Sequence, residues 1–181
     1  MNYKPSSFFF FLSISAFLCS CLRSPVEQMN TSDDTSFVHI DTGVFVVFPY
    51  DYTQYWMFKN CKPVELTDKD YETIEQVLRT SIMNYNQERT RYMQTLSADD
   101  TANKFNQKDF IIDLNRYKRQ YVAVVNAKGE KEVWVNCFCG NFTQESRTSI
   151  VEVNDGGNCY FSVKINLTNK MFYDFYVNGE A

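Results

Sequence analysis

The chain has 181 residues and a formal net charge of −4, and 17% of its residues are aromatic. This length is typical of one domain with a sizeable core. The mild acidity disfavours a nucleic-acid-binding surface, which would need clustered lysine and arginine, and it disfavours docking on anionic lipid head groups.

The chain begins with a short apolar run. Residues 8–18 are apolar except for Ser13 and Ser15, and Lys4 precedes them. A membrane-spanning helix needs about 20 apolar residues, so this run is too short to span a bilayer. It fits the hydrophobic region of a secretory signal peptide, and residues 1–20 are therefore predicted to be one.

The end of this run, Leu18-Cys19-Ser20-Cys21, resembles a bacterial lipobox. The resemblance implies that Cys21 becomes the first residue of the mature protein and carries acyl chains such as palmitate. More than one such chain anchors a protein stably in a membrane. The alternative is an ordinary signal peptide cut nearby, which would leave Cys21 as a plain thiol.

Residues 22–36 are polar, contain one proline and show no apolar period, which predicts a flexible tether. A single domain is expected over 37–181. Two short apolar runs flank the turn signal at 41–43 and predict a small hairpin. The sole histidine, His39, lies in the first run. We interpret it as a half-exposed strand residue rather than a catalytic group.

Residues 68–85 carry the pattern of an amphipathic helix. Thr67 and Asp70 have the spacing of a capping box, with aspartate in place of the usual glutamate. Residues 86–109 are polar and are interpreted as a loop, with a helical extension through Tyr92 and Leu96 as the alternative. The apolar positions recur at helical spacing; they are Tyr71, Ile74, Leu78, Ile82 and Tyr85.

The remainder of the chain alternates with a period of two, which predicts strands at 117–125, 131–139, 149–153, 158–168 and 171–177. On the last strand we expect Tyr173, Phe175 and Val177 to share one face. One long helix followed by about five antiparallel strands predicts a two-layer α+β domain, because the helix stripe and one face of the sheet bury each other. Cystatin-like folds have this order, by analogy only.

Four cysteines follow the tether, and an exported protein would use them in up to two disulfides. Cys137 and Cys139 lie two apart on one strand, where a bond between them would strain the backbone. Each is expected to pair elsewhere, with Cys61 or Cys159. A four-thiolate zinc site is disfavoured because its ligand pairs are usually separated by two to four residues, and a redox-active pair is the other alternative.

Residues 155–181, DGGNCYFSVKINLTNKMFYDFYVNGEA, together with the strands YKRQYVAVVN and KEVWVNCFC, resemble a group of uncharacterised lipoproteins and secreted proteins of the Bacteroidota. Members share the DGG turn, a cysteine-aromatic strand, a VKINL-like run and a VNG-type end. The resemblance covers residues 110–181. It implies a bacterial envelope location, periplasmic or on the cell surface, and no particular activity.

Two features could carry a ligand. The turn Asp155-Gly156-Gly157-Asn158 lacks the ligand pattern of a calcium loop, and no helix is predicted after it to hold a phosphate, so we interpret it as a hairpin turn. Aromatic side chains could instead form a binding platform for a glycan or a peptide, unless they pack into the core. The platform candidates are Tyr50, Tyr52, Trp56, Tyr160 and Tyr176.

These observations predict a lipid-anchored envelope protein that binds a protein, a peptide or a glycan and needs no metal or cofactor. One alternative is an enzyme of unrecognised type, such as a hydrolase, that uses aspartate or tyrosine groups in a pocket. Converging carboxylates would favour that alternative. Another is a structural component of the envelope.

Overall fold

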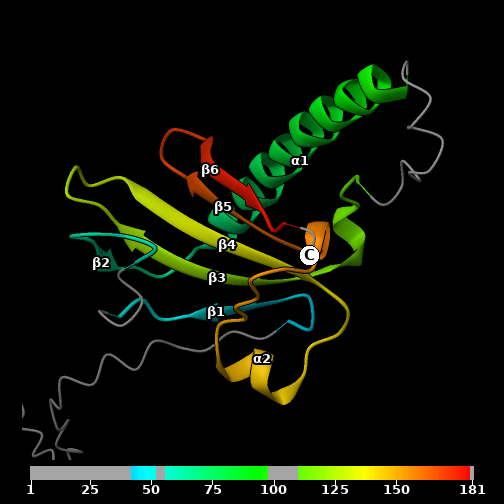
Figure 1. Ribbon diagram of the computed structural model, residues 1–181. Helices are drawn as coiled ribbons and strands as arrows, with labels where there is room; N and C mark the ends of the chain where they lie inside the picture. Colours follow the sequence, from blue (N-terminus) through cyan, green and yellow to red (C-terminus); the bar gives the residue numbers. More distant parts are fainter. Residues whose placement is uncertain (1–41, 52–55, 98–109, 180–181) are drawn as a thin grey trace, which may run out of the picture. The chain divides into compact units, whose positions relative to one another are not determined.

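The computed structural model describes residues 42–51, 56–97 and 110–179 (Figure 1). They contain one long helix and a mixed sheet, so the predicted α+β class is confirmed. The predicted signal peptide, lipidated Cys21, tether, His39 and Tyr52 lie outside the described residues. The main elements are β1 Phe45–Phe48, β2 Lys62–Pro63, α1 Asp68–Ser97, β3 Tyr117–Val125, β4 Lys131–Cys139, α2 Gln144–Thr148, β5 Tyr160–Asn166 and β6 Met171–Val177.

The sheet has the strand order β1-β3-β4-β5-β6, with β2 beside β3. Strands β3 to β6 form the predicted antiparallel meander, and β3, β4 and β6 have the predicted bounds. Strand β1 instead pairs with β3 in parallel. Parallel neighbours need a long connection, and α1 lies within the one that joins β1 to β3. The first run of the predicted N-terminal hairpin lies outside the described residues.

Helix α1 begins at the predicted cap. The Thr67 backbone N–H donates to Asp70 Oδ2 over 2.8 Å, and the Asp70 N–H donates to Thr67 Oγ1 over 3.4 Å. The helix then continues to Ser97, so the alternative of a helical extension through Tyr92 and Leu96 is confirmed, and the interpretation of residues 86–97 as a loop is wrong. The prediction stopped where the regular apolar stripe stopped, but residues that favour helices, such as Gln87 and Glu88, extend the helix beyond that stripe.

Both faces of the sheet are buried at its central strands, β3 and β4, by different means. We call the face against α1 the helix face and the opposite one the outer face. The helix face packs on the helix stripe Ile74, Val77, Leu78 and Ile82 and includes Tyr121, Val133, Val135, Cys137, Phe161, Val163 and Ile165. The outer face carries Val122, Val124 and Trp134 together with Val46 and Phe48 of β1, and irregular segments cover it with Tyr50, Met57 and Phe58.

The strand predicted at 149–153 does not form. Two buried side-chain amides of the sheet, Gln120 and Asn136, bind this segment instead, and we call them the amide clamp. Gln120 Oε1 accepts from the Val151 N–H over 2.8 Å, and Asn136 Nδ2 donates to the Val151 carbonyl over 2.8 Å. Gln120 Nε2 donates to the carbonyls of Ser146 and Ser149 over 2.7 and 2.8 Å. The segment therefore lies across the sheet without joining it.

Strand β6 contains a bulge that changes the predicted facing. Ser162 pairs with Tyr176 and Lys164 with Tyr173, so β6 has one more residue than β5 between these pairs. Asp174, inside the bulge, has a φ of 48°. The prediction that Tyr173 shares a face with Phe175 and Val177 is wrong, because the extra residue moves Tyr173 to the outer face. The residues of β6 that pack on the helix-face core are Phe172, Phe175 and Val177.

Candidate functional site

The predicted aromatic platform assembles in part. Tyr50 does not belong to it, because its side chain is buried and its hydroxyl donates to the Phe58 carbonyl over 3.0 Å. Trp56 is 53% exposed and meets Trp134 of β4 edge to face, with ring centres 5.4 Å apart. Among the described aromatic residues of this stretch, Tyr50 and Phe58 belong to the core whereas Trp56 is exposed, and their spacing shows no regular period that would predict this.

Tyr160 and Tyr176 lie on the outer face, as predicted. Tyr176 is 61% exposed, while Tyr160 is half-buried beside Phe138 of β4. The bulge adds Tyr173, 37% exposed, which the sequence prediction had placed on the other face. The outer face of β5 and β6 therefore presents three tyrosines to solvent.

One disulfide, Cys139–Cys159, joins the end of β4 to the start of β5. The strand register explains the pairing, because Phe138 lies opposite Tyr160 and the two cysteines occupy the next positions. A zinc site that uses all four thiolates is therefore excluded. The remaining described cysteines cannot pair with each other, since they lie on opposite faces of the sheet. They are Cys61 on the outer face and Cys137 on the helix face.

The free thiols differ in their surroundings. Cys137 is fully buried, and burial raises the pKa of its thiol well above the usual range. Burial also raises the pKa of the half-buried Cys61, with a further contribution from the Glu132 carboxylate against a lowering by Lys164. A raised pKa disfavours the reactive thiolate, so neither site has the character of a nucleophile.

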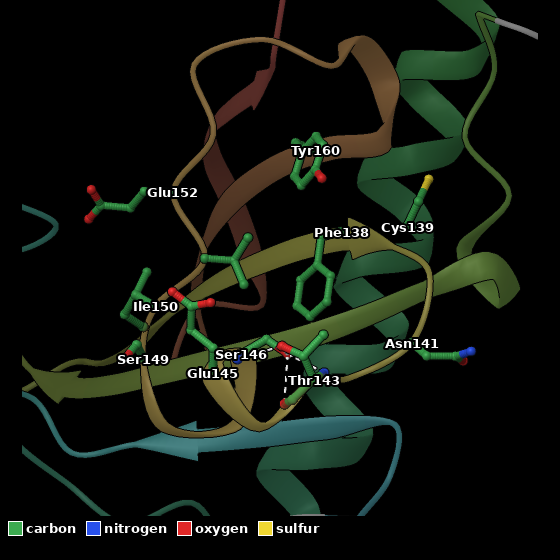
Figure 2. Close-up of a pocket in the computed structure, with 11 residues that line it drawn as sticks. Phe138, Cys139, Asn141, Thr143, Glu145, Ser146, Ser149, Ile150, Glu152 and Tyr160 are labelled. Carbon is green, nitrogen blue, oxygen red and sulfur yellow. Dashed lines mark hydrogen bonds between the residues drawn. The ribbon is translucent and has the colours of Figure 1, made fainter.

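A pocket of about 450 Å³ lies on the outer face beside α2 (Figure 2). We call it the acidic pocket. The rings of the neighbouring Phe138 and Tyr160 line it from the sheet, and the segment 141–152 lines the other side. Its remaining lining residues are Cys139, Asn141, Thr143, Glu145, Ser146, Ser149, Ile150, Val151 and Glu152.

Three devices hold this pocket in shape. The disulfide fixes its rim, and the amide clamp fixes its wall at Ser149 and Val151. A capping box starts α2, because the Ser146 N–H donates to Thr143 Oγ1 over 3.1 Å and the Thr143 N–H donates to Ser146 Oγ over 2.8 Å. The site is therefore built before any ligand arrives, which reduces the ordering cost of binding.

The charged side chains that line the acidic pocket are all negative. Among the described residues, Glu145 and Glu152 are the charged side chains that line it, and no lysine or arginine does so. In Figure 2 the Glu145 carboxylate lies beside Ile150, whereas the Glu152 carboxylate points away from the rings of Phe138 and Tyr160. A pocket lined by carboxylates and by aromatic rings favours a positively charged group, because both attract a cation. Neither glutamate was predicted from the sequence as a site residue, because residues 149–153 have the pattern of a strand and no local motif marks Glu145.

Across the described ranges no three Cys, His, Asp or Glu side chains gather into a possible metal site. No helix in this part of the chain is long and apolar enough to cross a membrane. Comparisons of the chain with protein-family models, with curated proteins and with solved structures found no match.

Proposed function

We propose that the protein is an exported, lipid-anchored binding module of the bacterial envelope, and that its acidic pocket receives a lysine or arginine side chain of a partner peptide or protein. The observation that carries this proposal is the lining of the pocket, whose charged side chains among the described residues are both acidic, Glu145 and Glu152, and whose rings come from Phe138 and Tyr160. The envelope location rests on the lipobox ending at Cys21 and on the Bacteroidota-like C-terminal motifs.

The strength expected of one such contact is modest. A partly exposed ion pair contributes about 0.2–1 kcal/mol, and a cation over an exposed aromatic ring contributes about 0.5–1 kcal/mol. A useful affinity therefore needs further contacts. The exposed Tyr173 and Tyr176 lie on the same face of the sheet and could pack against neighbouring residues of the partner.

The test is calorimetric titration of the purified protein with lysine-containing peptides and with the same peptides acetylated on lysine. Acetylation removes the charge and keeps the length, so we expect it to weaken binding by about fivefold or more. The double substitution E145Q/E152Q should abolish that preference. Glu72→Gln, on the exposed side of α1, is the matched control and should leave it unchanged. Equal affinity for both peptide forms would contradict the proposal.

The hydrolytic alternative has one observation in its favour, the presence of two carboxylates in one pocket. Glycoside hydrolysis needs an acid and a base or nucleophile on either side of the bond that breaks. The outward direction of Glu152 in Figure 2 does not provide that arrangement. Turnover of chromogenic glycosides by the purified protein, lost in E145Q, would replace the binding proposal.

The anchor has a separate test. The intact mass of the protein from its native host should equal that of residues 21–181 with attached acyl chains. A cut at another position, or a mass without lipid, would contradict lipidation at Cys21 and leave the pocket proposal intact.

A further inference from the structure

A second pocket, also of about 450 Å³, lies where α1, the turn before β5 and the end of β6 meet. It is separate from the acidic pocket, because Phe175 and Val177 of its lining belong to the helix face. The rings of Tyr85, Phe110 and Phe175 give it an aromatic lining, and Arg89 of α1 is the one charged residue among its described lining residues. We call it the arginine pocket.

Arg89 differs from the other partly buried cations. Arg119 pairs with Glu75, and Lys131 pairs with Asp70 over 2.7 Å. The guanidinium of Arg89 instead lies 5.5 Å from the ring centre of Phe110 and 5.6 Å from that of Tyr92. Among the described residues no carboxylate forms an ion pair with Arg89, and its buried Nε–H has no acceptor.

The polar side chains of the lining do not offer a competing site for a cation. The Asn158 amide donates to the Ile111 carbonyl over 3.1 Å, and the Asn178 amide donates to the Asp155 carbonyl over 2.9 Å. Both amides are therefore held by the backbone of the loops around them. The group that remains available to bind a ligand is the planar guanidinium of Arg89, whose paired N–H donors match the two oxygens of a carboxylate.

We propose that the arginine pocket binds a small organic anion that carries a carboxylate on a flat, apolar body. The carboxylate would accept hydrogen bonds from the Arg89 guanidinium, and the body would lie against the rings of Tyr85 and Phe175. Partial burial strengthens this attraction, because a charge enclosed by aromatic rings is less screened by water than one on the surface. This inference is independent of the acidic pocket, which has the opposite charge and lies on the other face.

The experiment is an amide chemical-shift titration of the purified, isotopically labelled protein with benzoate, and with the neutral benzamide as the matched probe. We expect benzoate to shift the amide signals of Gly157, Asn158 and Gly179 and benzamide to bind at least about tenfold more weakly. Arg89→Gln should remove the difference between the two probes.

Arg89→Lys is the second variant, because it keeps the charge and the aliphatic stem but loses the planar pair of donors. It should retain an intermediate affinity for benzoate, which separates anion binding from a role of Arg89 in packing alone. If Arg89→Gln fails to fold, the relative affinities for benzoate and benzamide in the native protein and in Arg89→Lys still test whether the pocket binds the carboxylate. Equal shifts by both probes, no shifts at these amides, or unchanged benzoate affinity in a folded Arg89→Gln variant would overturn the proposal.

Discussion

The two faces of the sheet show two ways to bury a surface. A single helix covers the helix face through a continuous apolar stripe. The outer face is covered by irregular segments around Phe58 and Ile150, and side-chain amides rather than strand pairing hold the second of these in place. The regular cover leaves the centre of its face without solvent access, whereas the irregular cover leaves a pocket.

This difference assigns different roles to the faces. Loops held by a rigid scaffold are the usual carriers of binding residues, and the segment 141–152 is such a loop. The apolar packing between α1 and the sheet provides the stability that lets the outer cover be irregular. The comparison predicts that changes on the helix face unfold the domain, while changes on the outer face loosen the acidic pocket first.

The largest effect is expected on the helix face. Leu78 of α1 is fully buried among the strands. Leu78→Ala removes apolar contacts and leaves a cavity, which should lower the free energy of unfolding by about 2.7–5 kcal/mol in urea denaturation. Glu72→Ala, on the exposed side of the same helix, is the control and should change it by less than about 0.5 kcal/mol. If Leu78→Ala lowered the free energy of unfolding by less than about 1 kcal/mol, the claim that the helix face provides most of the stability would be contradicted.

Removing the disulfide should have the next largest effect. Cys139 and Cys159 are 20 residues apart, and closing a loop of this length stabilises a fold by about 3 kcal/mol. The variant C139S/C159S should lose most of this stability and exchange its amide hydrogens faster over 141–151. Cys61→Ser, which breaks no disulfide, serves as the comparison. Similar stability of the two variants would contradict the role of the bridge as the rim of the pocket.

A substitution in the amide clamp tests most directly whether the two faces of the sheet unfold independently. Gln120→Met keeps the length of the side chain but leaves the Ser146 and Ser149 carbonyls and the Val151 N–H without their partner. Unsatisfied buried groups should cost about 1–3 kcal/mol. Hydrogen exchange should accelerate over 144–151 and stay unchanged in α1. Uniform acceleration in both regions would show that the two faces unfold as one unit.

The smallest effect concerns the start of α1. Burial alone would raise the pKa of Asp70, but its hydrogen bonds with Lys131 and Thr67 outweigh burial and lower the pKa below its usual value. A carboxyl whose pKa is lower in the folded state adds stability above its unfolded pKa and loses it as the pH falls through the folded one. Asp70→Asn should therefore flatten the dependence of stability on pH below about 4 and cost about 1 kcal/mol at neutral pH. An unchanged pH profile would contradict this assignment.

The sequence predicts the helix face well because that face is periodic. The alternation over 117–125 and 131–139 and the stripe from Tyr71 to Ile82 are local patterns, and the structure keeps them. The outer cover has no such period. Its position depends on Gln120 and Asn136, which read as ordinary polar strand residues until the segment they bind is known.

The pocket residues were harder to predict than the elements that hold them. Tyr160 and Tyr176 follow from alternation, but Tyr173 depends on the bulge at Asp174. Arg89 lies in a polar stretch of α1 near Tyr85 and Tyr92, but the rings of Phe110 and Phe175 come from segments distant in the chain. No local sequence pattern indicates that residues from distant segments pack together, so the pocket that they form can be recognised only in the three-dimensional structure.

The most direct test of the central claim maps where a cation binds. A lysine-containing peptide and its acetylated form would be titrated in turn into the labelled protein while the amide signals are followed. We predict that the charged peptide shifts the amides of the acidic pocket, including Ser149 and Glu152, and that the acetylated peptide does so far more weakly. Shifts confined to other surfaces, or identical shifts with both peptides, would contradict a cation-binding site on the outer face.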